Sequence, residues 1–291
     1  MVNEKDLREE ISQVDSLGQL VEVYGEIASF RMKKIRNFVL KNRDFLDSIN
    51  DIFKDALNSY SRKLADLVAK GKLKKGGKVT FLAHNGKTVS VFISANTGFY
   101  GDIVQATYRK FLDEVKDKDV EITIIGRLGR SLLVGSQPKT PYTYFELKDY
   151  GVDRKKIAEV VRHLVQYEKI IVYYGKYNTV ITQTPSRFSI SAGTEITQDV
   201  RKTQRIYIFE PSVEKILMFF ETEIFASLFD QSIRESQLAK FASRILAMDK
   251  ADQNIEGKLK DLRLERLKLT HKLSASKQLN SLSSVLFSDI K

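Results

Sequence analysis

Apolar side chains recur at alternating spacings of four and three residues along the first part of the chain. The series begins at Leu7 and reaches Tyr60, and only two glycines and Asn42 interrupt it. A seven-residue apolar repeat held for this long indicates a helix that buries one continuous stripe against a partner helix, as in a coiled coil. We therefore expect one helix over residues 4–66, on the order of 90 Å long at about 1.5 Å per residue.

The last part of the chain carries a similar but less regular pattern. Its apolar positions fall mostly three, four or seven apart from Ser212, which can cap a helix after Pro211, to about Phe287, with Gly257 as the one helix breaker. Two such helices could form a parallel homodimeric coiled coil. Because both belong to one chain, effective concentration favours an antiparallel pair within the molecule.

Helix breakers separate these two parts from the middle of the chain. All four prolines lie between residues 138 and 211, and 12 of the 15 glycines lie between residues 71 and 193. Both residue types disfavour helix interiors, so their depletion at the two ends agrees with long helices. We expect three domains: an N-terminal shaft helix, a central α/β domain and a C-terminal shaft helix, at residues 1–70, 71–211 and 212–291.

Short apolar runs alternate with amphipathic stretches in the central domain. This order predicts a Rossmann-like α/β domain with a partly parallel sheet and a hairpin near its end. The helices are expected at 101–115 and 153–168, and the strands at 78–83, 88–95, 121–127, 144–149, 169–174, 178–183, 187–192 and 204–209.

Composition narrows the chemistry that the chain can perform. It has no cysteine and only three histidines, far apart in sequence, which excludes disulfides, thiolate nucleophiles and cysteine-ligated metal sites. No signal-peptide core and no apolar run of about 18 residues is present, so we expect a soluble cytoplasmic protein. Of the net charge of +11, the central domain carries +9, which keeps nucleic acid, anionic lipid and acidic proteins in view as partners.

Two glycine-containing loops are the candidates for ligand binding. The first, residues 94–101, joins a strand to a helix, where ligands can bind, but a tight turn built on Gly98 and Gly101 is the simpler interpretation. The second contains Gly126 and Gly129 and lacks the remaining glycine of a dinucleotide fingerprint, so we interpret it as a turn. We expect no catalytic residue, no cofactor and no metal site.

Several segments resemble the gamma subunit of F-type ATP synthases, the central rotor shaft. Residues 235–254, ESQLAKFASRILAMDKADQN, are similar to the family's carboxyl-terminal signature, and residues 7–9 and 27–32 to its opening stretches. In the middle, residues 94–101 and 125–130 are similar to two of the family's loops. The resemblance runs nearly from end to end.

The resemblance implies a non-catalytic rotor that couples proton translocation to ATP synthesis or hydrolysis. The implied partners are the ring of alpha and beta subunits, the epsilon subunit and the c-ring, with no nucleic acid, at the cytoplasmic face of the bacterial cell membrane. Apolar residues near the tip of the last helix would slide in a hydrophobic bearing. The candidate partner contacts are Ala28, Arg31, Met32, Glu235, Arg244, Met248, Asn254, Leu279, Leu282, Val285 and Leu286.

Three alternatives remain at this point. The chain could be a coiled-coil adaptor, with or without nucleic-acid binding, or the shaft of a related ATPase that has a different membrane partner. It could also be a small-molecule enzyme, which would need a ligand pocket near Gly98 and Gly101.

Overall fold

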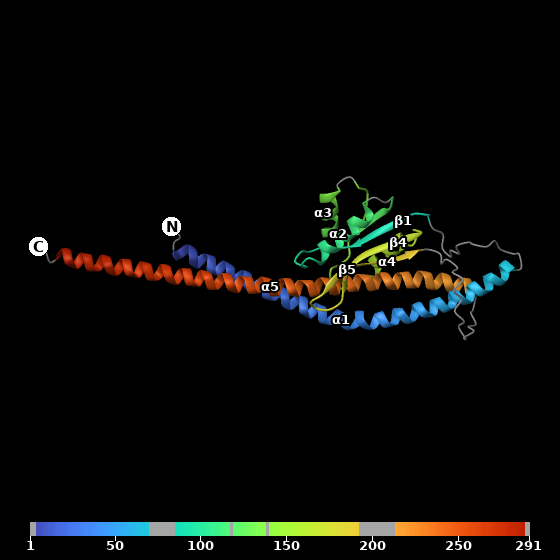
Figure 1. The fold of residues 1–291 in the computed structure, drawn as a ribbon, viewed down its shortest axis with the longest axis horizontal. Helices are drawn as coiled ribbons and strands as arrows, with labels where there is room; N and C mark the ends of the chain where they lie inside the picture. The colour runs from blue at the N-terminus through green and yellow to red at the C-terminus, as the bar shows by residue number, and fades with distance from the viewer. Residues whose placement is uncertain (1–3, 70–84, 117–118, 138–139, 192–212, 289–291) are drawn as a thin grey trace. The chain divides into compact units, whose positions relative to one another are not determined.

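Two long helices, α1 (Glu4–Ala69) and α5 (Val213–Ser288), precede and follow the central part of the chain (Figure 1). Both agree with the lengths expected from the apolar repeat. The computed structural model describes residues 4–69, 85–116, 119–137, 140–191 and 213–288. The strands expected at 78–83 and 204–209 lie outside these residues.

The chain divides into two compact units, and each long helix contributes to both. The first unit contains residues 1–29 and 244–291, and the second contains residues 30–243. Among the described residues, no helix combines the length and apolarity needed to cross a membrane.

The first unit consists of the beginning of α1 and the later part of α5, which lie side by side and antiparallel. A Cβ added at Gly18 would lie 3.3 Å from Cγ2 of Ile255, and one added at Gly25 would lie 3.6 Å from Cβ of Met248. The first distance is tighter than most Cβ contacts and the second is ordinary, so Gly18 in particular allows a close approach of the two helices. The apolar residues buried in this unit are Leu7, Ala28, Met248, Leu259 and Leu262.

The second unit contains a five-stranded sheet in the order β3-β2-β1-β4-β5. The first four of these strands are parallel to one another, and β5 is antiparallel to β4. At the centre of the sheet, Val91 pairs with Thr123 on one side and with Val172 on the other. The strands are β1 (Thr88–Ile93), β2 (Glu121–Ile125), β3 (Thr143–Phe145), β4 (Lys169–Tyr177) and β5 (Gln183–Ser191).

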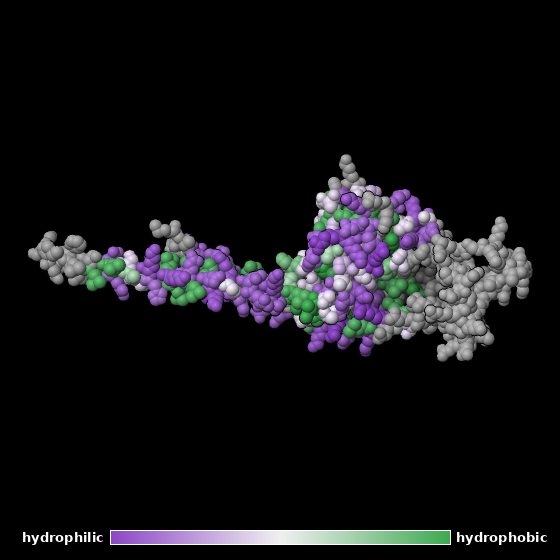
Figure 2. All heavy atoms as spheres, in the orientation of Figure 1, coloured by the Kyte–Doolittle hydropathy of each residue, from purple (hydrophilic) through white to green (hydrophobic). Residues whose placement is uncertain are grey.

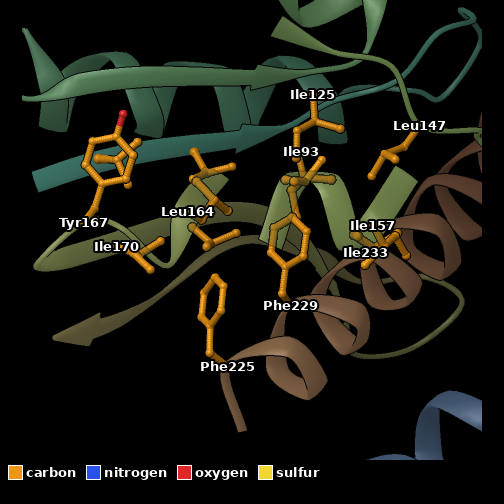
Figure 3. Close-up of a cluster of buried hydrophobic side chains, with 14 residues drawn as sticks. Ile93, Ile125, Leu147, Ile157, Leu164, Tyr167, Ile170, Phe225, Phe229 and Ile233 are labelled. Atoms are coloured by element: carbon orange, nitrogen blue, oxygen red, sulfur yellow. The ribbon is translucent and has the colours of Figure 1, made fainter. Parts of the chain in front are cut away.

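One face of the sheet packs against α4 (Arg154–Leu164) and the early part of α5. The carboxylate of Asp153 caps α4 by accepting hydrogen bonds from the backbone N–H groups of its first turn. Alternate residues of the strands, such as Val91 and Val172, point to this face and are fully buried. They meet α5 through Phe225, Phe229 and Ile233 (Figure 3).

The opposite face packs against α2 (Ile103–Val115) and α3 (Arg127–Ser136). Its centre is aromatic: Phe92 of β1 stacks on Phe111 of α2 at 5.5 Å between ring centroids, and Phe111 meets Tyr173 of β4 edge-on at 5.4 Å. Aromatic pairs in these geometries add to the hydrophobic burial. The sheet is therefore covered on both faces, as parallel sheets require.

Several elements differ from the sequence expectation. The strand expected at 144–149 ends at Phe145 as β3, and the helix expected at 153–168 ends at Leu164 as α4. The loop containing Gly126 and Gly129, expected to be a turn, continues into helix α3, and Gly129 lies within that helix. The strands expected at 178–183 and 187–192 are instead a turn followed by one strand, β5. The turn is held by backbone N–H groups of Asn178 and Thr179 that donate to the carbonyl of Thr182.

Candidate functional site at the carboxyl edge of the sheet

The loop after β1 holds a carboxylate supplied by the segment after β3. The backbone N–H of Asn96 donates to Asp149 at 2.9 Å, and the N–H and hydroxyl of Thr97 each donate to it at 3.0 Å. The Asn96 side chain in turn donates to the carbonyl of Leu147 at 2.6 Å and accepts from the N–H of Arg127 at 3.0 Å. One asparagine therefore ties together the segments that follow three neighbouring strands.

Glycine is required where these segments touch. Gly126 has a φ of +102°, and a Cβ there would lie 2.8 Å from the carbonyl oxygen of Ala95. A Cβ at Gly129 would lie 2.7 Å from Cβ of Ser94. Both distances are shorter than real Cβ contacts, so glycine lets α3 begin directly against the end of β1.

The expected turn at residues 94–101 uses Gly101, as predicted, but not Gly98. Gly101 has a φ of +55°, and a Cβ there would clash with the hydroxyl of Ser243 on α5. Gly98 does not adopt a positive φ and has open space around it. The neighbouring Phe99 takes the left-handed conformation instead, with a φ of 64°.

Helix α5 inserts two long polar side chains into this edge of the sheet. The ammonium of Lys240 donates to the carbonyl of Ser94 at 2.8 Å and lies 3.6 Å from a carboxylate oxygen of Asp149. The amide of Gln237 donates to the carbonyls of Lys148 at 3.1 Å and Gly151 at 2.9 Å. Lys240 and Gln237 are 4% and 2% exposed, so these bonds form in a nearly dry interior.

The contacts around Asp149 lower the pKa of its carboxyl group. Burial by itself raises the pKa of the carboxyl group, but the ammonium of Lys240 and the hydrogen bonds from Asn96 and Thr97 outweigh burial and hold it below its usual value. Asp149 is therefore ionised, and Lys240 and Asp149 form a buried ion pair. We call the set Ser94, Asn96, Asp149, Gln237 and Lys240 the polar joint.

An aromatic cluster flanks the polar joint, with Phe241 of α5 between two tyrosines of the neighbouring loops. Phe241 meets the rings of Tyr100 and Tyr150 edge-on, at centroid distances of 6.2 and 6.1 Å. The guanidinium of Arg31, from α1, lies 5.0 Å from the ring centroid of Tyr150 and 5.9 Å from that of Phe241. Both long helices are thus fixed to the loops at this edge.

The space left at the polar joint is too small for a ligand. The cavity lined by Ser94, Asp149, Lys240 and their neighbours measures about 10 Å³, close to the minimum that a single water needs. Within the described part of the chain, no three His, Cys, Asp or Glu side chains gather to hold a metal ion. Neither Gly98 nor Gly101, beside which an enzyme would need its ligand pocket, lines this cavity.

A second polar cluster joins α1 to α5 within the same unit. Arg43 donates to Glu235 at 2.7 Å and to the carbonyl of Tyr177 at 2.9 Å. Asn42, which interrupts the apolar repeat, donates to Gln231 at 2.8 Å. The hydrogen bond that Arg43 donates to Glu235 raises the pKa of the Arg43 guanidinium, against the opposing effect of its burial. These polar contacts fix the axial register of the two helices.

In the first unit, α1 exposes apolar side chains beside its buried stripe. Leu17, Leu20, Tyr24 and Ile27 are 51%, 57%, 42% and 38% exposed. Their spacing of three, four and three residues places them on one side of the helix. Figure 2 shows apolar side chains at the surface of this unit among polar ones. A repeated exposed apolar stripe of this kind marks a contact surface.

The predicted partner-contact residues differ in their exposure. Ala28, Glu235, Arg244 and Met248 are buried at 8% exposure or less, and for them contact with a partner stays a prediction. Met32 and Asn254 lie on α1 and α5. Leu279 and Leu282 are 64% and 62% exposed. Val285 and Leu286 lie in α5, but their side chains are outside the described residues.

Sequence reasoning missed the polar joint. Lys240 and Gln237 lie within the segment that carries the family resemblance, but nothing in the sequence paired them with residues 86–146 positions earlier. The available signal was a lysine placed among small and apolar residues on a helix, as in Leu238-Ala-Lys-Phe-Ala242. Such a lysine is buried only when it has a partner.

Fold and site together define a class of protein in which a terminal helix, rather than a ligand, fills the carboxyl edge of an α/β sheet. A family model described as ATP synthase matches residues 3–269. The chain therefore belongs to the ATP synthase family.

Relatives and solved structures with the same organisation agree. The chain is 28% identical to the ATP synthase gamma chain of Elusimicrobium minutum, over 86% of this chain and 87% of that protein. It is 23% identical to the ATP synthase gamma chain of Flavobacterium johnsoniae, over 93% and 92%. Its fold is similar to a chain in the central stalk and c-ring structure of the Tetrahymena thermophila mitochondrial ATP synthase, with a TM-score of 0.60 and 18% identity, covering 80% of this chain and 99% of that one.

Proposed function

We propose that this chain is the gamma subunit, the central rotor, of an F-type ATP synthase. In this role α1 and α5 form an antiparallel coiled-coil shaft within the ring of alpha and beta subunits. The Rossmann-like α/β domain binds the epsilon subunit and the c-ring at the cytoplasmic face of the bacterial membrane. The chain is not an enzyme: its rotation changes which of three identical sites binds, makes or releases nucleotide.

The observation that carries this proposal is the continuity of α5. The same helix supplies Phe229 to the core of the sheet and Lys240 to the polar joint, then continues to Leu262, which is buried against α1 in the first unit. A rotor needs such a connection, because torque applied to the α/β domain must reach the shaft without slipping. A buried ion pair and close-packed helices resist that slip, whereas exposed flexible contacts would not.

The exposed apolar stripe on α1 supports the same role. Leu17, Leu20 and Ile27 would face the ring, where apolar contacts lack the directional bonds that would impede turning. Leu279 and Leu282 would do the same near the tip of α5. The excess positive charge of residues 71–211 would attract polar loops of the c-ring and anionic lipid headgroups, and this attraction should weaken as salt increases.

A single-molecule rotation assay tests the proposal. Because the chain has no cysteine, Ser131→Cys on the exposed surface of α3 provides one attachment point for a bead. The chain is assembled with the alpha and beta subunits of its own complex, and the ring is fixed to glass. We expect rotation in one direction when ATP is added and none with a non-hydrolysable ATP analogue.

The matched variant places aspartate at Leu17 and Leu20 in the labelled chain. We expect it to fold normally, because both side chains are exposed, but to assemble poorly or to hydrolyse ATP without steady rotation. Failure of the unmodified chain to assemble, or a stationary bead on a ring that hydrolyses ATP, would refute the rotor role.

A further inference from the structure

A large open groove lies in the second unit, away from the polar joint. It has a volume of about 780 Å³ and is bordered by α4, by the early part of α5 and by Phe38 of α1. Its floor is largely apolar, with Ile157 and Val161 from α4 and Ala226 from α5. Phe38 is 45% exposed at its border. The volume is within the range of binding pockets, but the open form suits a polypeptide better than a small molecule.

The two bordering helices present their side chains at helical spacing. The α4 border carries Ala158, Val161 and Val165, three and four residues apart, and the α5 border carries Ala226 and Asp230, four apart. Alanine on both borders leaves room for a close neighbour. A groove between two helices with small residues on each side accepts the ridge of a third helix.

The groove also carries positive charge, part of which no described residue neutralises. Of its charged residues, Arg234 pairs with Asp230 at 2.7 Å and lies 4.1 Å from the ring centroid of Phe38. Arg154 and Arg162 also line the groove, and neither forms an ion pair with a described residue. Arg154 lies in the first turn of α4, where the helix dipole disfavours a cation. Among the described residues, the groove therefore offers two arginines that an acidic partner could bind.

We propose that this groove binds an amphipathic, acidic α-helix from another subunit of the assembly. The apolar face of that helix would contact Ala158, Val161 and Ala226, and its carboxylates would pair with Arg154 and Arg162. Arginine suits this role because its planar guanidinium binds carboxylates in a bidentate manner. The inference rests on the proposed function only in that the assembly supplies the partner.

Site-specific photo-crosslinking in the purified intact assembly tests the proposal. The photoreactive amino acid p-benzoylphenylalanine replaces Ala158, which is exposed, and the crosslinked peptides are identified by mass spectrometry. We expect an adduct with a segment of another subunit that has apolar residues three and four apart and at least two acidic residues. The same amino acid at Ser131, on α3 across the sheet, should give no adduct with that segment.

A charge-reversal arm tests the role of the arginines. We expect Arg154→Glu with Arg162→Glu to reduce the adduct at least tenfold, and Arg162→Gln alone to reduce it less. The control, Lys169→Glu with Lys176→Glu, makes the same change in net charge at exposed positions of β4 and should leave the adduct unchanged. All these side chains are exposed, so circular dichroism should show unaltered folding.

Several outcomes would overturn the proposal. One is an adduct with residues 70–84 or 192–212 of the same chain, or with a second copy of it. Another is an adduct with lipid or with a segment that lacks acidic residues. The absence of any adduct would overturn it as well. An adduct that survives the arginine reversal would also overturn it. Steady rotation of the labelled chain without the expected adduct would remove this inference and leave the rotor role intact.

Discussion

Replacing Lys240 with methionine removes the cation from the polar joint while keeping most of the side-chain volume. The lysine and Asp149 side chains are 6% and 12% exposed, and their charged atoms lie 3.6 Å apart. Methionine fills the space of the lysine stem, so little cavity forms. The variant therefore tests the ion pair and the hydrogen bond to Ser94 rather than packing.

The expected loss follows from charge, distance and burial. At 3.6 Å and an effective dielectric constant of about 20, the attraction is roughly 5 kcal/mol, which the desolvation of both ions offsets in part. Removing one partner of a buried pair costs about 3–5 kcal/mol. Asp149 keeps its hydrogen bonds from Asn96 and Thr97, so we expect a loss of about 3 kcal/mol, at the lower end of that range.

Hydrogen exchange measured by mass spectrometry on the full chain reads this loss directly. Amides of β1, residues 89–93, exchange only when the sheet opens, so a loss of about 3 kcal/mol should speed their exchange on the order of 100-fold. Lys176→Met, at an exposed position of β4, serves as the control and should change the rate little.

A double-mutant cycle with Asp149→Asn separates the ion pair from the lysine's other contacts. We expect the second substitution to cost much less in the Lys240→Met background than in the natural sequence, with a coupling of about 2 kcal/mol. A cost below 1 kcal/mol for Lys240→Met, or strictly additive losses, would refute the view that this ion pair holds α5 to the sheet.

Three further measurements test other parts of the second unit. Gly129→Ala should lower the free energy of unfolding by about 1–3 kcal/mol in urea titrations because its Cβ meets a neighbouring side chain, whereas Gly98→Ala, which has open space, should not. Because the pKa of Asp149 is lowered on folding, its stabilisation is complete above its unfolded pKa of about 4 and is lost as the pH falls through the folded value. The difference in free energy of unfolding between the natural chain and Asp149→Asn should therefore shrink as the pH falls from 6 to 3, and a constant difference would contradict this. Arg43→Met should cost about 2 kcal/mol by leaving Glu235 with an unpaired charge, and Glu235→Gln in the same chain should recover part of it in thermal unfolding.

The long helices were predictable because their signal is local and repeated. An apolar stripe over residues 4–66 predicted α1 (Glu4–Ala69), and the apolar spacing after Pro211, with Gly257 as the one breaker, predicted α5 (Val213–Ser288). Each additional heptad strengthens the same inference, so errors at single positions such as Asn42 do not matter. The central strands were found for a similar reason, because buried parallel strands are short apolar runs.

The turn expected at Gly126 and Gly129 was wrong because glycine has two structural uses that sequence alone does not distinguish. At Gly126 it provides a positive φ, as expected of a turn, but at Gly129 it makes room within a helix for the end of β1. Only the packing of α3 against Ser94 shows which of the two uses applies at Gly129. The polar joint was not predicted because the sheet brings together residues that are far apart in sequence. No local sequence pattern indicates that they lie close in space.

The position of the polar joint explains why an α/β domain in this chain need not bind a small molecule. The strand order places β4 on the opposite side of β1 from β2, and in open parallel sheets ligands bind outside the carboxyl ends of the strands at such a reversal. Here Lys240 donates to the carbonyl after β1, and Gln237 to carbonyls after β3. The groups that would hold a ligand instead hold a helix, so a binding crevice has become an attachment point for α5.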